Sequence, residues 1–410
     1  MKKISLLILA LGATVCAGAQ ANVLKDAERA MKGGEEYSKV LEIVTPAFSD
    51  PTTAEQAQTY FIPAQAAFEQ YKKMLGMKQV GMLKSHADSL KMNTLLIPAY
   101  EYSVKALPLD PVTDAKGKVK TKYTKNILNN LEDYYVDYNT AAAEQYNLKD
   151  YKGAYNLWKI FFEIPEVPGM EERLAKSGKV FADTLQGLIY FNQGIAAWQL
   201  EELDNALEAF MKAKSKGYKE KYVYDYGIAV ALGAGKNDTL LAFAKEALPL
   251  YGKEDPQYIG QIVNYYLQTK QYDEAFDNIN KAIELDPNNS QYYVIKGVIF
   301  DYTEKKDDAR ESFHKAAELD PQNGQALYNY GRMLCEQAFA LNDGAPTTQA
   351  EYDTYYNEKI KPLFQQAVEV LENAYQVDPD NRDVLLYLEN AYYNLKDEKM
   401  YEDVQKRKMY

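Results

Sequence analysis

The sequence predicts an all-α fold in which antiparallel helix pairs stack as a solenoid. The main observation is that matching small residues and prolines in the middle of the chain recur at a constant spacing of 34 in residue number. A fixed period in this range is typical of solenoids built from repeated units. The matching pairs are Gly297 and Gly331, Ala275 and Ala309, Ala282 and Ala316, and Pro287 and Pro321.

The second observation is where small, aromatic and turn residues fall within each unit. Gly297 lies midway along a predicted first helix, helix A, and Ala309 and Ala316 share one face of the following helix B. The two helix axes can therefore approach closely, and Phe313 fills the space on the same face of helix B. Asp-Pro ends each helix B because proline cannot continue the hydrogen-bonded backbone, and the Asn-rich residues after it can cap the next helix.

These features carry a resemblance to a known family. The segments YDEAFDNINKAIELDPNN (272–289) and DDARESFHKAAELDPQN (307–323) resemble the second helix and exit turn of a tetratricopeptide repeat (TPR). The resemblance implies a right-handed superhelix of antiparallel helix pairs that acts as a non-catalytic scaffold for protein–protein contacts.

The resemblance also implies a concave groove lined by helix A residues. Its mixed polar character suits an extended or helical peptide. The TPR subfamily that grips acidic C-terminal tails needs a set of Lys, Asn and Arg in this groove, and only Asn264 fits, so we reject that function. The implied groove residues are Gln257, Gly260, Asn264, Leu267, Gln268, Gln291, Val294, Val298, Asp301, Tyr302, Gln325, Tyr328, Arg332, Cys335 and Glu336.

Residues 1–21 read as a secretory signal peptide, with two lysines, a short apolar run and small residues at the end. We therefore expect export, with the periplasm favoured over secretion. A lipid anchor on Cys16 is less favoured, because Val15 stands where lipoprotein signals carry a small residue. No later apolar run has the roughly 18 residues that a membrane-spanning helix requires.

Charge and cysteine content narrow the function classes further. Without Lys2 and Lys3 of the signal peptide, 45 basic side chains stand against 59 acidic ones, a formal charge of −14. An acidic chain of this kind is a poor ligand for nucleic acid. Cys335 is then the only mature cysteine, so an intramolecular disulfide is excluded.

Residues 22–165 are expected to form degenerate repeats that open the solenoid. Ala99, Ala106 and Pro111 reproduce the spacing of Ala309, Ala316 and Pro321, so residues from about 75 to 97 are an insertion, either an extra helix or a lid. A loop at 112–126 follows, and we expect a long helix from Asn126 to Tyr146. The loop is either simply solvated or a docking patch for an acidic partner. Its lysines are Lys116, Lys118, Lys120, Lys122 and Lys125.

Residues 166–381 are expected to hold the more regular repeats, which brings the chain to about eight units. Ala367, Ala374 and Pro379 follow Ala309, Ala316 and Pro321 at a spacing larger than the repeat period, so a segment is inserted within the last unit. We place this insertion at about 335–358 and expect helix A to run long before a loop. Residues 382–410 are expected to be capping helices with a polar end.

The sequence offers few residues for catalysis. Only His86 and His314 are present, and no metal-binding or nucleophile motif accompanies them, so we predict no catalytic, metal or cofactor site. The expected partner is a protein or peptide. Two alternatives stay open: an accessory subunit of an envelope assembly or uptake system that contacts partners through its insertions, and an enzyme or carbohydrate-binding protein whose site the insertions build.

Overall fold

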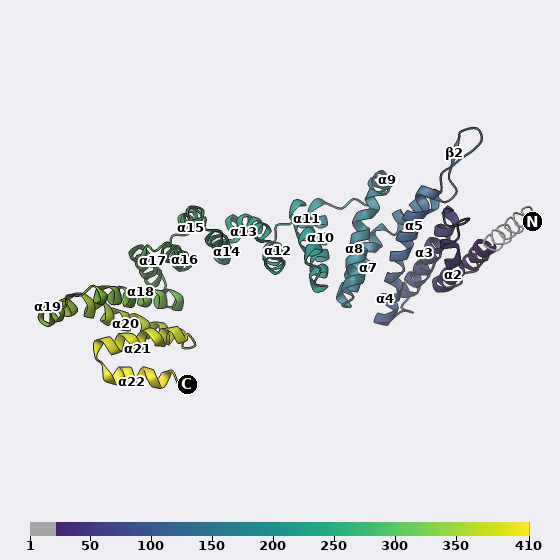
Figure 1. The fold of residues 1–410 in the computed structure, drawn as a ribbon. Helices are drawn as coiled ribbons and strands as arrows, with labels where there is room; N and C mark the ends of the chain where they lie inside the picture. Colours follow the sequence, from purple (N-terminus) through teal and green to yellow (C-terminus); the bar gives the residue numbers. More distant parts are fainter. Residues whose placement is uncertain (1–21, 410) are drawn as a thin grey trace, which may run out of the picture. The chain divides into compact units, whose positions relative to one another are not determined.

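The computed structural model describes residues 22–409, and over this range the chain is an all-α solenoid of helix pairs (Figure 1). The predicted fold class is therefore confirmed, while the predicted signal peptide lies outside the described residues. The chain divides into two compact units after Val223. The predicted boundaries at 165/166 and 381/382 mark where one kind of repeat gives way to another. They are not boundaries between compact units, so the division after Val223 does not test them and they stay predictions.

The first unit consists of helix pairs with one extra helix in the second pair and one after the third. Residues 22–32 are helical and pair with α2. The bounds of the remaining helices are α2 (Tyr37–Val44), α3 (Ala57–Gln79), α4 (His86–Thr94), α5 (Leu96–Ala106), α6 (Thr124–Asp133), α7 (Tyr135–Asn147), α8 (Tyr151–Glu163), α9 (Met170–Lys176), α10 (Asp183–Gln199) and α11 (Leu203–Ser215).

The segment predicted as an insertion at about 75–97 is an extra helix. α3 continues to Gln79, and α4 then packs against α3, α5 and α7. Glu144 of α7 holds the insertion in place, because it accepts hydrogen bonds from Lys78 Nζ at 2.7 Å and from Asn93 Nδ2 at 2.9 Å. Burial alone would raise the pKa of Glu144, but the hydrogen bonds from Asn93 and Lys78 outweigh it and lower that pKa.

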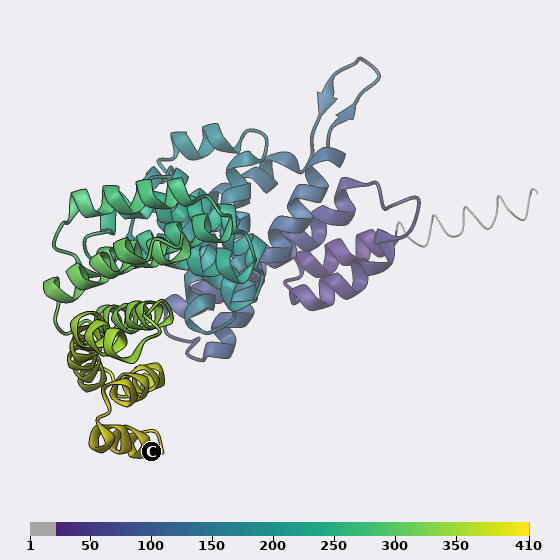
Figure 2. The ribbon, with the colours of Figure 1, turned by 60° about the vertical axis from the view of Figure 1, so that its left-hand side comes forward.

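The loop predicted at 112–126 contains a short β-hairpin, and α6 begins at its end. β1 (Val112–Thr113) and β2 (Val119–Lys120) pair antiparallel, and the hairpin projects from the helices of the first unit (Figure 2). Sequence reasoning considered only the lysines of this segment and missed the turn between the strands. At this turn Gly117 adopts a left-handed backbone with φ of 75°. Asp114 closes the turn, since its side chain accepts from the backbone N–H groups of Lys116 and Lys118.

The base of the hairpin is fastened by one buried carboxylate. Asp110 accepts hydrogen bonds from the backbone N–H groups of Lys122, Tyr123 and Thr124 and from the Thr124 hydroxyl, at 2.7 to 3.0 Å. Burial alone would raise the pKa of Asp110, but these hydrogen bonds outweigh it and hold that pKa below its usual value. The point where the chain leaves α5 and the point where it enters α6 are thereby tied together.

The single helix predicted over 126–146 is in fact two helices that meet at Tyr134. α6 ends at Asp133 and α7 begins at Tyr135. The break places the Tyr134 ring against α3, 5.6 Å from the Phe68 ring and 5.4 Å from the Tyr71 ring. These tertiary contacts, which local propensity does not reveal, decide where the helix ends.

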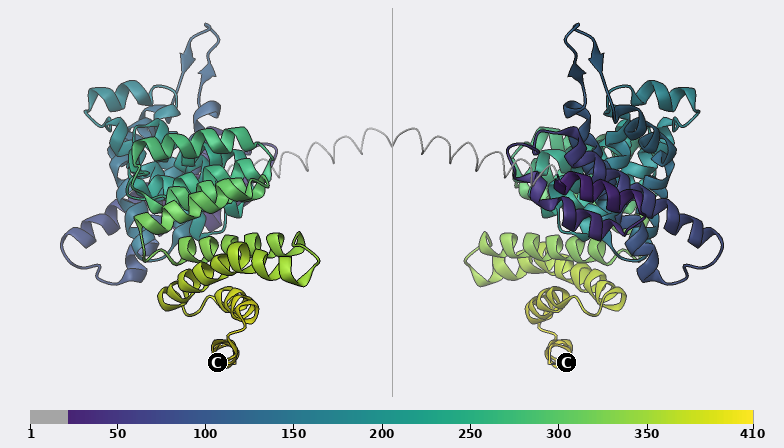
Figure 3. Two further views of the ribbon diagram at one scale, coloured as in Figure 1. Left: turned by 90° about the vertical axis from the view of Figure 1, so that its left-hand side faces the viewer. Right: turned by 90° about the vertical axis from the view of Figure 1, so that its right-hand side faces the viewer.

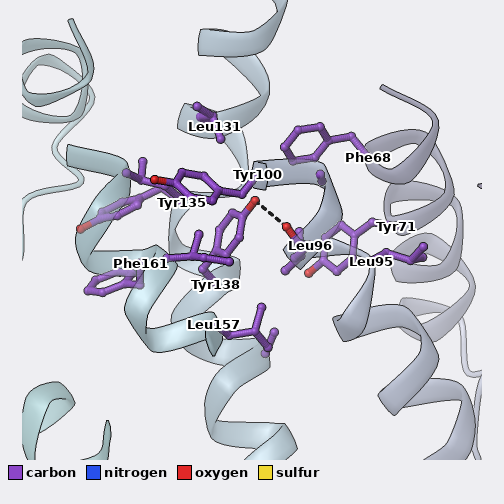
Figure 4. Packing of buried hydrophobic residues seen from close by; sticks show 14 of the residues in the cluster. Phe68, Tyr71, Leu95, Leu96, Tyr100, Leu131, Tyr135, Tyr138, Leu157 and Phe161 are labelled. Atoms are coloured by element: carbon purple, nitrogen blue, oxygen red, sulfur yellow. Dashed lines mark hydrogen bonds between the residues drawn. The ribbon is translucent and has the colours of Figure 1, made fainter. Parts of the chain in front are cut away.

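Tyrosine supplies much of the core of the first unit (Figure 4). The Tyr138 side chain is fully buried, and its hydroxyl donates to the backbone carbonyl of Leu96 at 3.0 Å. Tyr135 stacks on Phe161 with ring centroids 4.6 Å apart. Tyr138 therefore satisfies its hydroxyl inside the protein, without contact to water.

The second unit carries the regular repeats, one long pair and the C-terminal helices. α12 begins just before the division of the chain. The bounds are α12 (Lys221–Gly233), α13 (Asn237–Tyr251), α14 (Gln257–Gln268), α15 (Tyr272–Leu285), α16 (Ser290–Tyr302), α17 (Lys306–Leu319), α18 (Gly324–Asp343), α19 (Gln349–Tyr355), a π-helix (Tyr356–Ile360), α20 (Lys361–Val377), α21 (Arg382–Leu395) and α22 (Glu398–Arg407).

The predicted second insertion lengthens a helix pair. α18 has 20 residues where α16 has 13, and α19, the π-helix and α20 follow one another back along it (Figure 3). Residues 344–348 form the connection. The tyrosine-rich end of the insertion is therefore helical.

A glycine on helix A packs against the side chain of helix B in several pairs. A Cβ atom added to any of these glycines would lie less than 3.0 Å from a side-chain carbon across the pair, so only glycine allows this approach. The pairs are Gly194 with Phe210, Gly227 with Phe243, Gly297 with Phe313, and Gly331 with Leu371.

We expect Gly297→Ala to lower the free energy of unfolding by about 1 to 3 kcal/mol, the usual cost of overpacking. Its Cβ would stand 2.6 Å from Cε1 of the buried Phe313 ring. Gly260→Ala is the matched control, because a Cβ there meets nothing within 4 Å and the helix should gain roughly 0.5 to 1 kcal/mol. Urea unfolding followed by circular dichroism measures both, and equal shifts in the same direction would contradict the close contact.

Candidate functional site

The helices that carry the predicted groove lie next to one another in the second unit, since α14 contacts α16 and α16 contacts α18. Most of the predicted groove residues are exposed or partly exposed, so they can be reached from solvent. They are Gln257, Gly260, Asn264, Gln268, Gln291, Val298, Asp301, Tyr302, Gln325, Tyr328, Arg332 and Glu336.

Three residues predicted for the groove belong to the core instead. Leu267, Val294 and Cys335 are 8 %, 1 % and 0 % exposed. Val294 shares a buried cluster with Leu327 of α18, so its position faces the neighbouring repeat. Burial raises the pKa of the Cys335 thiol to about 12, which keeps it protonated and unreactive.

Three of the remaining groove residues form one ion-pair network with Lys306. Arg332 lies 2.7 Å from both Asp301 and Glu336, and Lys306 lies 2.5 Å from Asp301. Burial alone would raise the pKa of Asp301, but the hydrogen bonds from Lys306 and Arg332 outweigh it and lower that pKa. Arg332 is thus held by two carboxylates, and it stabilises the contact between α16 and α18.

Glutamines recur at the first or second residue of three successive A helices. Gln257, Gln291 and Gln325 share the spacing of the repeat, and Gln291 Nε2 donates to Gln325 Oε1 at 3.3 Å. This contact puts the amide groups of neighbouring repeats in register along the edge of the groove. Each primary amide carries both donors and an acceptor, as a peptide backbone does.

A pocket of about 550 Å³ opens beside these glutamines. Side-chain amides and turn residues dominate the lining of this pocket. From the sequence, the asparagines among them were predicted only to cap the next helix. Asn289 and Asn323 do cap α16 and α18, and Asn323 also donates to the Ser290 hydroxyl at 2.9 Å. The lining residues are Pro256, Gln257, Gly260, Asn288, Asn289, Ser290, Gln291, Ile295, Asp320 and Asn323.

The tyrosines predicted for the groove lie in different surroundings. Tyr302 is 65 % exposed at the end of α16. Tyr328 meets the ring of Tyr387 from α21 at 6.0 Å. Sequence reasoning missed Tyr387, because it was assigned to a capping helix outside the groove.

A second pocket of about 540 Å³ lies between the insertion and the last two helices, and its lining is rich in tyrosine. The repeat pattern gave no signal for this pocket. The pocket is formed by two segments that are distant in sequence, the insertion and the last two helices, and both lie outside the repeat period. The signal that could have found it is the density of tyrosine in both segments. The lining residues are Gln349, Tyr352, Asp353, Tyr356, Tyr392, Tyr393, Asn394, Lys396, Asp397, Glu398 and Tyr401.

The predicted docking patch lies on the hairpin and at the start of α6. Lys116, Lys118, Lys120, Lys122 and Lys125 are all exposed. Two of them already have partners: Lys120 lies 3.0 Å from Asp114, and the Lys122 ammonium lies 4.8 Å from the centre of the Tyr123 ring. The structure therefore presents the lysines to solvent.

The two histidines lie on the surface and apart from any metal-binding cluster. His86 is exposed at the first residue of α4, while the His314 ring packs 4.7 Å from the Tyr330 ring. Within residues 22–409, no three His, Cys, Asp or Glu side chains are placed to hold a metal ion. Across the same residues, no helix has both the length and the apolar character that crossing a membrane demands.

Comparison with known proteins identifies the family. One model of the tetratricopeptide repeat matches residues 188–215 and 256–289, and a second matches residues 296–338. These segments are tetratricopeptide repeats, as the sequence predicted, and repeats of this kind support a protein-interaction scaffold. No curated protein sequence matches the chain.

Several solved TPR structures are similar to parts of the chain. YrrB, described as a TPR protein with an unusual peptide-binding site, is 18 % identical over 53 % of this chain and 96 % of its own, with a TM-score of 0.32. The C-terminal part of a TPR protein from Cytophaga hutchinsonii is 17 % identical over 64 % of this chain and 97 % of its own, with a TM-score of 0.33. A TPR protein from Bacteroides fragilis NCTC 9343 is 15 % identical over 63 % of this chain and 98 % of its own, with a TM-score of 0.33.

The ion-pair network predicts a specific pH dependence. The pKa of Asp301 is lower in the folded state than its ordinary value of 3.8, so its carboxylate stabilises the fold above that value and loses this effect as pH falls through the folded pKa. Asp301→Asn should therefore lower the melting temperature at pH 7 and pH 5, and the difference from the wild type should be smaller at pH 3, because the carboxylate loses its effect as pH falls below 3.8.

Asp307→Asn is the control for this prediction, because the Asp307 side chain is 84 % exposed and pairs only with Arg310 in the described chain. It should change the melting temperature little at any of the three pH values. A difference between Asp301→Asn and wild type that persisted unchanged at pH 3 would contradict the assigned role of the carboxylate.

Proposed function

We propose that the chain is exported to the cell envelope, with the periplasm as its location, and that it holds an extended peptide segment of a partner protein along the groove of its second unit. The repeats make it a protein-interaction scaffold. The compartment, the groove as the binding surface and the extended form of the bound segment are what we propose beyond the scaffold.

The row of glutamines is the observation that carries the groove proposal. Gln257, Gln291 and Gln325 recur once per repeat, and the pair at 291 and 325 is joined by a hydrogen bond. Amides spaced along a groove can pair with successive peptide groups of an extended chain, which gives affinity without depending on side-chain identity. The pocket beside them supplies open space next to Gly260, where the peptide backbone can come close to α14.

Export is supported by the composition of residues 1–21, which carries the charged start, apolar run and small-residue end of a signal peptide. The second candidate is an accessory subunit of an envelope assembly or uptake system that contacts its partner through the insertion. The tyrosine-lined pocket at the insertion favours it.

Site-specific photo-crosslinking in the native host tests the groove. A photoreactive amino acid at Gln257 or Gln291 should capture a partner, because both residues line the pocket. The same amino acid at Glu311, an exposed residue of α17 on helix B of its pair, should capture nothing. Capture from Glu311 alone would contradict the groove.

Replacing both Gln257 and Gln291 by Ala should weaken capture of that partner roughly tenfold, which corresponds to the loss of one to two hydrogen bonds. Deletion of residues 341–356 should leave capture unchanged. Loss of the partner only in the deletion would replace the groove by the insertion as the contact surface.

Export predicts a processed N-terminus. Intact-mass measurement of the protein from the native host should show removal of about 19 to 21 residues and recovery in the periplasmic fraction, as the small-residue sites indicate. Recovery of the full-length chain from the cytosol would refute export, and an acylated Cys16 would identify a lipid anchor in place of a free periplasmic protein.

A further inference from the structure

We propose that the tyrosine-lined pocket at the insertion binds a cationic side chain, of the lysine or arginine type, presented by a partner polypeptide. We name its residues the insertion pocket: Gln349, Tyr352, Asp353, Tyr356, Tyr392, Tyr393, Asn394, Lys396, Asp397, Glu398 and Tyr401. The proposal does not depend on the groove, since the two pockets share no residue.

The two walls of the insertion pocket come from different elements that are hydrogen-bonded together. α19 and the π-helix form one wall, and the end of α21 with the start of α22 forms the other. The Tyr356 hydroxyl donates to the Asn394 carbonyl at 2.5 Å and links the walls directly. The Tyr352 hydroxyl donates to Asn342 of α18 at 2.9 Å. The pocket is therefore a built feature of the fold.

The tyrosine hydroxyls of the insertion pocket are largely occupied by protein. Besides Tyr352 and Tyr356, Tyr392 donates to Glu372 at 3.0 Å, and the Tyr401 hydroxyl lies 3.4 Å from Gln405 Nε2. What these residues offer a ligand is the ring and not a polar hydroxyl. The negative face of an aromatic ring attracts a cation.

Tyr393 is the most accessible aromatic ring of the pocket. It is 70 % exposed, and its centroid lies 6.0 Å from that of Tyr401. On the opposite wall, the rings of Tyr352 and Tyr356 are stacked with their centroids 6.0 Å apart. Rings on both walls can thus surround the apolar stem of a long cationic side chain and face its charged end.

The charges around the insertion pocket also select a cation. Its lining holds three carboxylates, Asp353, Asp397 and Glu398, against one ammonium, Lys396. Asp397 is committed to the start of α22, where it accepts from the Met400 N–H at 3.1 Å and offsets the positive helix end. Among the ion pairs of the described chain, Asp353 and Glu398 have no cationic partner, so their charge remains for a ligand.

Saturation-transfer NMR with the mature protein tests the proposal. The probes are an acetylated, amidated Gly-Ser-Lys-Ser-Gly peptide, its arginine version, its version with acetylated lysine, and the neutral trisaccharide cellotriose. The lysine and arginine peptides should bind, and their binding should weaken with added salt. The acetyl-lysine peptide and cellotriose should bind at least several-fold more weakly.

Variants locate the binding. Tyr393→Ala should weaken binding of the lysine peptide roughly two- to fivefold, the range expected for a cation–π contact at an exposed site. Glu398→Gln should weaken it by up to about fivefold, the range expected for the loss of an exposed ion pair. Both replaced side chains are exposed, so the variants should fold, which circular dichroism checks. Tyr222→Ala, which removes a similarly exposed tyrosine outside both the insertion pocket and the groove, should leave binding unchanged.

Three results would overturn the proposal. Equal binding of the lysine and acetyl-lysine peptides would show that charge is not recognised. Binding of cellotriose without binding of the cationic peptides would assign the pocket to a sugar. Unchanged binding in both pocket variants, or no binding of any cationic probe, would remove the insertion pocket as the site.

Discussion

Close contact between a glycine of helix A and a bulky side chain of helix B governs the geometry of this solenoid. In three pairs the glycine and the phenylalanine have the same separation in sequence, which is that of Gly297 and Phe313. In the intervening pair, Val263 and Ile279 occupy the equivalent positions, so a larger residue on helix A is matched by a smaller one on helix B. Because a larger side chain on one helix is met by a smaller one on the other, the two helices of each pair pack closely and successive A helices stay in register. The row of glutamines depends on that register.

The same contact explains how the chain accepts an insertion without losing the repeat. Gly331 packs against Leu371, and the separation of these two residues in sequence exceeds that of Gly297 and Phe313 by the length of the insertion. The added residues extend α18 and the helix that returns along it, beyond the point of contact. The core of the pair therefore remains that of an ordinary repeat, while its far end is free to meet α21 and α22 and to form the insertion pocket.

Periodicity predicted the fold well because it reports packing that recurs. The helix pairs, the long α18 and the caps at Asn289 and Asn323 all follow from spacing and turn chemistry. The break at Tyr134 and the hairpin were missed, since each depends on one side chain meeting a partner distant in sequence or on a single left-handed residue. The candidate site was predicted only in part: a count of positions within each unit cannot show that Val294 is buried, that Arg332 is held between two carboxylates, or that two tyrosine-rich segments meet.

The carboxylate of Asp110 makes the hairpin tip structurally independent of the helical core. It gathers three backbone N–H groups and one hydroxyl at the base, so the entry and exit of the hairpin are fixed whatever its tip contains. Since the tip contributes nothing to the helical core, its residues can change in evolution at little cost to folding. That decoupling makes the stretch from Lys116 to Lys118 a natural place to graft a foreign epitope or a fluorescent label.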